Sequence, residues 1–167
     1  AASDVYKRQV FVVGGMASLI NVHAETYGDY EYEINADGKT VTITKYMKED
    51  EYDPETGWTI VDNNPLYIPA SIEGRKVTII GEESFKGILG NSNIVIPNGV
   101  EQIGLSAFEG MYNLTSVSLP NTLKVIGQTA FFDCMDLSVI TLPDSLEEIG
   151  DNAFGYTNIS SVSVSYT

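Results

Sequence analysis

The residues that most often carry out chemistry in enzymes are scarce in this sequence. It contains one histidine, His23, and one cysteine, Cys134. Ser-His-Asp and Cys-His nucleophilic sites need an imidazole as the base, and many zinc sites need one as a ligand. His23 lies in a segment that we predict below to be a signal peptide, so the mature chain would contain no histidine. We therefore expect neither kind of nucleophilic site and no zinc site that contains histidine.

Acidic residues offer two further possibilities. Glu147 and Glu148 are adjacent carboxylates. In the repeats described below, the position of Glu147 is held by Glu101 in one unit and by Lys124 in another. This indicates a tolerant surface position, not the acid/base pair of a glycosidase.

Residues 47–57, MKEDEYDPETG, contain five acids and could bind calcium or form a solvated loop tip. The loop is favoured because the ligand order of a calcium-binding EF-hand loop is missing. We predict a non-enzymatic chain that needs no cofactor.

Composition narrows the class of protein further. The 167 residues are 43% hydrophobic and 19% charged, and 23 acidic against 9 basic side chains give a net charge of −14. Such values are typical of one ordinary globular domain and exclude a collagen, a disordered polyelectrolyte and a disulfide-stapled mini-protein. Lysine and arginine cluster only in pairs, so no nucleic-acid partner is expected. An acidic surface instead favours cationic, cation-bridged or uncharged partners.

An internal repeat of 23 residues organises most of the chain. Segments 94–116 and 117–139 align without gaps, and 140–161 aligns after deletion of one residue. Self-similarity at a fixed period of this length is typical of solenoid proteins. The residues that recur at this spacing are Gly81, Gly104, Gly127, Gly150, Phe85, Phe108, Phe131, Phe154, Ala107, Ala130, Ala153, Pro97, Pro120 and Pro143.

Each recurring position has a physical role if the repeats stack as coils. Alternating apolar residues, such as Ile94 and Ile96, predict a short strand buried on one face, and stacking would pair these strands in a parallel sheet about 4.8 Å apart. The proline that follows would end the strand. Val100 and Ile103 would point inward across a turn, and the next glycine would permit a tight or positive-φ bend. The phenylalanines would form a stacked spine.

The repeat unit resembles the BspA-type leucine-rich repeat, whose pattern is roughly LxxIxLPxxLxxIGxxAFxxCxxL. Residues 114–137, LTSVSLPNTLKVIGQTAFFDCMDL, match it, and the resemblance covers about residues 66–164. It implies a mainly β repeat solenoid, a right-handed coil with short parallel strands, which we assign to 69–167 as four to five units. The family's cysteine position is filled in successive units by Ile88, Met111, Cys134 and Thr157. No cysteine ladder is therefore expected, and Cys134 is predicted to be a buried, inert thiol.

The region before the repeats, residues 25–68, is predicted to be an N-terminal β cap. Residues 30–46 form alternating segments on either side of Asp37-Gly38, which is a strong hairpin signal. A solenoid also needs its first apolar coil covered. A further strand is predicted at 57–61. Tyrosines are numerous in this region and could form a sugar-stacking patch, but their tendency to form strands is the favoured explanation.

Both ends of the sequence carry expectations of their own. Residues 10–20 form an apolar run too short to span a bilayer, with small residues shortly before Glu25, and this predicts a secretory signal peptide. The first nine residues resemble an assembly artefact, so 1–24 is assigned to an artefact plus a truncated signal peptide. The sequence ends within an expected strand at 162–167. We therefore expect a fragment whose last coil self-associates through its open edge.

The leading hypothesis of function is a non-catalytic binding or adhesion module of a secreted or cell-surface bacterial protein. BspA-like proteins are surface adhesins, which implies protein or glycan ligands on host matrix or other cells, and no membrane span in the mature chain. One alternative is a set of accessory repeats that target a larger secreted hydrolase to its substrate, and another is a structural spacer. The candidate binding residues are those on the outward side of the strand sheet: Asn93, Val95, Ser116, Ser118, Val139, Thr141, Ser161 and Ser163.

Overall fold

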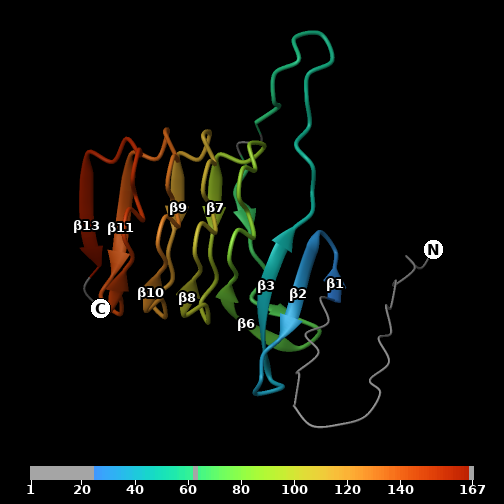
Figure 1. Cartoon of the computed structure of the whole chain (residues 1–167), viewed down its shortest axis with the longest axis vertical. Helices are drawn as coiled ribbons and strands as arrows, with labels where there is room; N and C mark the ends of the chain where they lie inside the picture. The colour runs from blue at the N-terminus through green and yellow to red at the C-terminus, as the bar shows by residue number, and fades with distance from the viewer. Residues whose placement is uncertain (1–24, 62–63, 166–167) are drawn as a thin grey trace, which may run out of the picture.

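The computed structural model describes residues 25–61 and 64–165, which form short β-strands joined by turns (Figure 1). The strands are β1 (Glu25–Tyr27), β2 (Tyr30–Ile34), β3 (Thr40–Tyr46), β4 (Leu66–Tyr67), β5 (Ser71–Ile72), β6 (Arg75–Ile80), β7 (Asn93–Val95), β8 (Gln102–Ile103), β9 (Ser116–Ser118), β10 (Val125–Ile126), β11 (Val139–Pro143), β12 (Glu148–Ile149) and β13 (Ser161–Ser165). Successive coils stack side by side, and this confirms the predicted mainly β solenoid. The artefact and signal peptide predicted at 1–24 lie outside the described residues. Within the described residues, no helix is long and apolar enough to cross a membrane.

The hairpin predicted at 30–46 is present as β2 and β3, which pair antiparallel. Its turn is held by Asp37, whose carboxylate accepts hydrogen bonds from the backbone N–H of Lys39 at 2.8 Å and of Thr40 at 2.9 Å. These bonds favour the ionised form and lower the pKa of Asp37. Gly38 completes the turn with a φ of 66°. The sequence did not reveal β1, which adds an antiparallel strand to the outer edge of β2.

The hairpin covers the first coil by continuing one of its sheets. β3 pairs in parallel with β6, and β8, β10 and β12 follow in that order. The side-chain amide of Asn35 donates to Thr78 Oγ1 on β6 at 3.2 Å and so joins the hairpin turn to the solenoid. Tyr32, Val41 and Ile43 are fully buried. The cap therefore shares a hydrophobic core with the repeats.

The coils contribute strands to two parallel ladders, whereas the sequence predicted one. The predicted strands are present as β7, β9, β11 and β13, with β4 pairing to β7, β7 to β9, and β11 to β13. Val100 and Ile103 are buried as predicted, but Ile103 lies in the strand β8 where a turn was predicted, and the equivalent residues form β10 and β12. Strands of two residues are too short to show the alternation by which strands are recognised in sequence.

The predicted phenylalanine spine is confirmed. Ring centroids are 5.1 Å apart between Phe85 and Phe108, 5.1 Å between Phe108 and Phe131, and 5.4 Å between Phe131 and Phe154. Tyr46 of the hairpin extends the stack, with its ring 5.2 Å from that of Phe85. These separations match the spacing of strands in a sheet, so one ring per coil fills the core along the whole solenoid.

The repeat glycines have a different role from the one predicted. Gly104 and Gly127 do not have positive φ; a Cβ on Gly127 would lie 2.6 Å from the carbonyl carbon of Gly104 in the preceding coil. Glycine is therefore required because the coils approach closely, not because the chain bends. In each coil, the residue two positions after the glycine adopts a positive φ, although it is not a glycine. These residues are Glu83, Ser106, Thr129 and Asn152.

The segment between β3 and β4 leaves the solenoid as an arm, residues 47–61, which projects from the body at the top of Figure 1. The strand predicted at 57–61 is wrong, because the arm contains only an isolated antiparallel bridge between Tyr52 and Thr59. A two-stranded ribbon without a third strand or a packed face has little to stabilise longer pairing.

Candidate interaction surface

The structure brings the predicted binding residues together on the outward side of β7, β9, β11 and β13. Asn93 pairs with Ser116 and Val95 with Ser118 across β7 and β9. The remaining four predicted residues pair across β11 and β13 in the same way, Val139 with Ser161 and Thr141 with Ser163. The residues between them, such as Ile94 and Val117, are buried. We call the eight outward residues the sheet face.

Hydroxyl and amide groups join neighbouring coils across the sheet face. Ser116 Oγ donates to Asn93 Oδ1 at 2.7 Å, and the hydroxyls of Thr141 and Ser163 are 2.9 Å apart. Val139 is the apolar residue that stands out, with 54% of its surface exposed. None of the eight residues is ionisable, so the sheet face offers hydrogen bonds and apolar contacts without a formal charge.

The opposite ladder carries charged side chains next to its short strands. Lys124 Nζ lies 2.7 Å from Glu101 Oε2 one coil away, and this contact raises the pKa of Lys124. Glu148 of β12 is in register with Val125 of β10, as the repeat alignment predicted. Glu147 and Glu148 are both exposed. Their exposure agrees with the predicted surface position.

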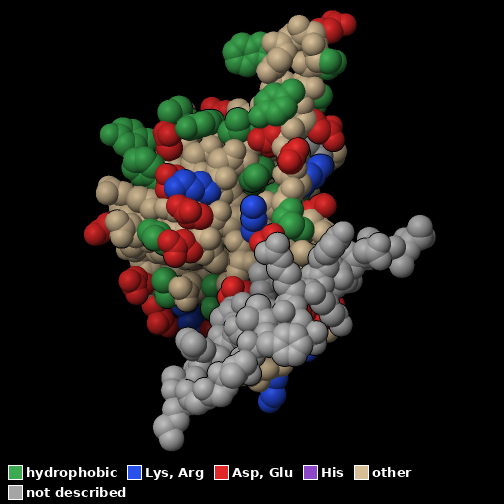
Figure 2. Space-filling model, turned by 45° about the vertical axis from the view of Figure 1, so that its right-hand side comes forward, with side chains coloured by type: hydrophobic (Ala, Val, Ile, Leu, Met, Phe, Trp, Pro, Cys, Tyr) green, Lys and Arg blue, Asp and Glu red, His purple; other side chains and the backbone are tan. Residues whose placement is uncertain are grey.

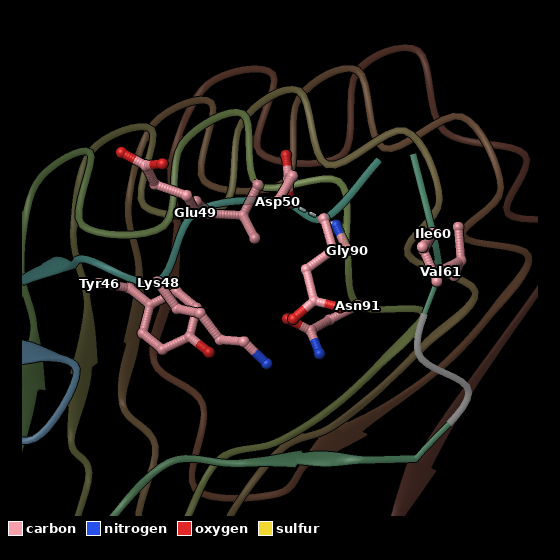
Figure 3. A pocket seen from close by; sticks show the side chains of 10 residues that line it. Tyr46, Lys48, Glu49, Asp50, Ile60, Val61, Gly90 and Asn91 are labelled. Carbon is pink, nitrogen blue, oxygen red and sulfur yellow. Dashed lines mark hydrogen bonds between the residues drawn. The ribbon is translucent and has the colours of Figure 1, made fainter. Parts of the chain in front are cut away.

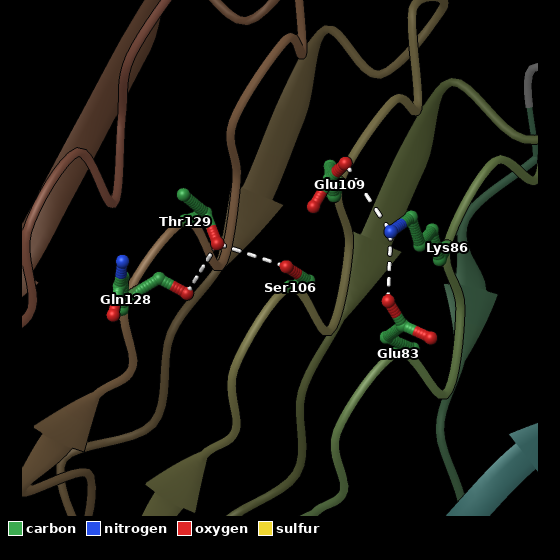
Figure 4. A network of polar contacts seen from close by, with 6 residues as sticks. All are labelled: Glu83, Lys86, Ser106, Glu109, Gln128 and Thr129. Atoms are coloured by element: carbon green, nitrogen blue, oxygen red, sulfur yellow. Dashed lines mark hydrogen bonds and ion pairs between the residues drawn. The ribbon is translucent and has the colours of Figure 1, made fainter.

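The turns that join the two ladders carry a polar network along the solenoid (Figure 4). Lys86 Nζ lies 2.7 Å from Glu83 Oε1 and 3.3 Å from Glu109 Oε1 of the next coil. Hydrogen bonding to Glu83 raises the pKa of Lys86, while Ser106 and Lys86 lower the pKa of Glu109. The hydroxyls of Ser106 and Thr129 are 2.8 Å apart. These groups satisfy one another, so the network stabilises the stacking of coils.

Cys134 lies in the core, as predicted. Its side chain is fully buried, and Sγ donates to the carbonyl oxygen of Phe108 at 3.2 Å. Burial raises the pKa of the thiol to about 12, because the apolar surroundings disfavour a thiolate. Since the thiolate is the nucleophilic form, this cysteine is unreactive in the folded chain.

The repeats match a known family over more than half of the chain. Residues 68–167 match the model of the BspA type leucine rich repeat region, with six copies. The chain belongs to the BspA-type leucine-rich repeat family. Leucine-rich repeat domains of this kind are generally protein-interaction modules and typically non-catalytic scaffolds. No curated protein matches the sequence.

Solved structures of bacterial leucine-rich repeat proteins share the fold. A leucine-rich repeat protein from Bacteroides capillosus ATCC 29799 is 30% identical with a TM-score of 0.69, and the match covers 86% of this chain and 99% of that one. The leucine rich repeat protein of T. pallidum is 24% identical with a TM-score of 0.61, covering 84% of this chain and 71% of that one. Both likenesses support a repeat solenoid.

Two hollows of this BspA-type protein flank the base of the arm. One, of about 270 Å³, lies between the arm and the first coil, and Lys48 and Asn91 point into it (Figure 3). A second, of about 580 Å³, is lined by Glu31 and Lys45 from the hairpin and by arm residues that include Lys48 and Glu49. Within residues 25–61 and 64–165, no group of three or more His, Cys, Asp or Glu side chains could hold a metal ion.

Proposed function

We propose that this chain is a non-catalytic, protein-binding module of a secreted or cell-surface bacterial protein, and that it binds through the sheet face. The observation that carries the proposal is the register that places four pairs of uncharged, outward residues on neighbouring coils. A flat array that combines hydrogen-bonding groups with an exposed valine suits the broad surface of a large partner, and repeat solenoids use such extended faces for binding.

More specifically, we propose that the module acts in adhesion. The expected ligands are proteins or glycans of the host matrix or of other cells. Support comes from the predicted signal peptide, from membership of the BspA-type family and from the lack of ionisable groups on the sheet face, which allows a partner to approach an otherwise acidic chain.

The proposal is tested by binding of the full chain to purified extracellular-matrix proteins, a purified mucin and washed bacterial cells. We expect saturable binding to one of these surfaces, weakened at least tenfold by Ser118→Arg, which places a bulky cation at the centre of the sheet face. Gln102→Arg on β8 is the matched control, because Gln102 is also exposed but lies on the other ladder. It should bind like the parent chain.

Two results would overturn this function. Absence of saturable binding to all three surfaces would remove the adhesive role. Equal binding by the Ser118→Arg and parent chains, with unfolding curves that match, would show that the sheet face is not the contact. The first result is what a structural spacer predicts, since a spacer binds none of these surfaces.

A further inference from the structure

The arm is a narrow antiparallel ribbon with two distinct faces. The backbone N–H of Ile60 donates to Glu51 at 2.7 Å, and that of Asp53 donates to Trp58 at 2.9 Å, on either side of the bridge between Tyr52 and Thr59. Side chains of paired residues lie on the same face of such a ribbon, and those of adjacent residues lie on opposite faces. One face therefore presents Trp58 and Ile60 with Glu51 and Asp53 beside them.

The arm is fixed to the body of the protein at its base. Both carboxylate oxygens of Asp50 accept a hydrogen bond from the backbone N–H of Leu89, at 2.9 and 3.0 Å, and Oδ1 also accepts one from Gly90 at 2.6 Å. Bonds from backbone N–H groups to an ionised carboxylate are among the stronger ones in proteins. The arm is thus anchored to the first coil at Asp50, beside the two hollows described above.

The arm exposes large apolar side chains along its length. Exposed fractions are 76% for Trp58, 56% for Tyr52 and 48% for Ile60. Tryptophan and tyrosine are among the residue types that contribute most to binding energy at protein interfaces. Figure 2 shows hydrophobic and acidic side chains together on the arm, above the rest of the surface. Nothing in the core of the solenoid depends on these side chains.

The charges of the arm indicate the chemistry of what it binds. Glu51 and Asp53 flank the apolar pair, and Glu49 and Glu55 are exposed on the same segment. The carboxylate of Asp53 accepts hydrogen bonds within the turn, which lower its pKa and keep it ionised. An anionic membrane or a second copy of this chain, with a net charge of −14, would be repelled. Cations beside an apolar site would be attracted, and could also lie over the indole ring.

We propose that the face of the arm formed by Trp58, Ile60, Glu51 and Asp53 docks into an apolar socket, flanked by lysine or arginine, on a protein partner. The proposal rests on the proposed function in that the partner is a protein, but it assigns a second contact surface that is separate from the sheet face. The arm supplies the anchor residue and its charges, while the sheet face supplies the broad, uncharged contact.

Trp58 is the only tryptophan of the sequence, so its fluorescence reports on the arm alone. The probe is a synthetic 14-residue amphipathic peptide of leucine and lysine, which presents an apolar stripe bounded by cations; the control peptide has glutamate in place of lysine. We expect the lysine peptide to shift Trp58 emission to shorter wavelength in a saturable manner, and the glutamate peptide to leave it unchanged. No shift with the lysine peptide, or an equal shift with both, overturns the proposal.

Variants locate the contact by the anisotropy of a labelled lysine peptide. Trp58→Ala should weaken binding at least tenfold, while Tyr156→Ala, which removes an equally exposed ring on a distant coil, should not. Glu51→Gln should weaken binding and reduce its salt dependence, and Glu147→Gln is the control for charge.

If Ser118→Arg lowers the affinity and Trp58→Ala does not, the peptide binds the sheet face and the arm proposal fails. Failure of the proposed function is a separate result, because it concerns binding to matrix, mucin and cells.

Two other occupants are tested by the same fluorescence signal. Uncharged phosphatidylcholine vesicles that shift the emission as strongly as the lysine peptide would make the arm a membrane-inserting element. An emission shift that depends on protein concentration alone would identify a second copy of the chain as the occupant. Either outcome overturns the proposal, and unchanged emission in both experiments supports it.

Discussion

Gly127 lies against the backbone of Gly104, so close that a Cβ at Gly127 would be 2.6 Å from the carbonyl carbon and 2.8 Å from the carbonyl oxygen of Gly104. The two glycines occupy the same position in successive coils. The carbonyl carbon and oxygen of Gly104 are backbone atoms. The two coils are joined here by the hydrogen bond from Gly127 N to the carbonyl oxygen of Ile103. The distance between coils at this corner is therefore set by the absence of a side chain.

Replacing Gly127 by alanine should destabilise the protein. Because the opposing atoms are backbone, the coils must separate to admit the methyl group, and overpacking of this kind costs about 1–3 kcal/mol in the free energy of unfolding. Urea unfolding followed by circular dichroism measures the loss. Gln128→Ala is the matched control, since this neighbouring side chain is exposed and its removal should change stability by about 0.5 kcal/mol or less. Equal unfolding midpoints for the two variants would contradict the packing argument.

The phenylalanines of the spine should contribute unequally to the free energy of unfolding. Phe108 is fully buried between two stacked rings, so Phe108→Ala should lower the free energy of unfolding by about 3–5 kcal/mol. Phe154 is only partly buried and has one ring neighbour along the spine, so Phe154→Ala should cost clearly less. Chemical denaturation of both variants tests this order, and a loss at Phe154 as large as that at Phe108 would refute it.

The coil positions and the spine could be predicted because they recur in sequence. Phe108 and Phe131 are of the same type at the same spacing, and stacking coils place them together whatever the details of the turns. The second ladder was missed because Gln102 and Ile103 form a strand of only two residues. Such a strand is created by its neighbours in adjacent coils, not by a local pattern.

Other features depend on contacts that have no local signal. Thr129 adopts a φ of 51°, although β-branched residues disfavour this region. It is held there by the neighbouring coils, where its hydroxyl meets that of Ser106. The anchoring of the arm joins Asp50 to Leu89, which are 39 residues apart in sequence. For the sheet face, the alternation of residues predicted which side chains point outward, while their role in binding remains a prediction.

Stability should fall in alkaline solution. Burial raises the pKa of Cys134 from 9.0 to about 12, and burial raises that of Tyr30 above its ordinary value of 10.0. The unfolded chain then loses protons at lower pH than the folded chain, so stability is complete below about pH 9 and decreases as the pH rises toward the folded values. The urea midpoint should be constant from pH 7 to about 8.5 and fall by pH 10.5.

The tyrosine contribution can be separated with a variant. Tyr30→Phe removes the titrating hydroxyl, so the midpoint should fall less steeply above about pH 10 than it does in the parent chain. Tyr67→Phe alters an exposed residue of β4 and should leave the slope unchanged. A midpoint that is constant or rises up to about pH 10.5 in the parent chain would contradict the direction assigned to these pKa shifts.

The thiol of Cys134 should resist labelling in the folded protein. With a pKa of about 12, only a trace of the thiol is ionised at neutral to mildly alkaline pH, and the buried sulfur is also inaccessible to a reagent in solvent. Ellman's reagent should therefore leave the native chain unmodified over minutes and label one thiol promptly in concentrated guanidinium chloride. Ser118→Cys provides the comparison, because a cysteine on the exposed end of β9 should react at once in the native state. Labelling of the parent chain at the rate of this exposed cysteine would show that the core around Phe108 and Cys134 opens readily, in conflict with the tight stacking of its coils.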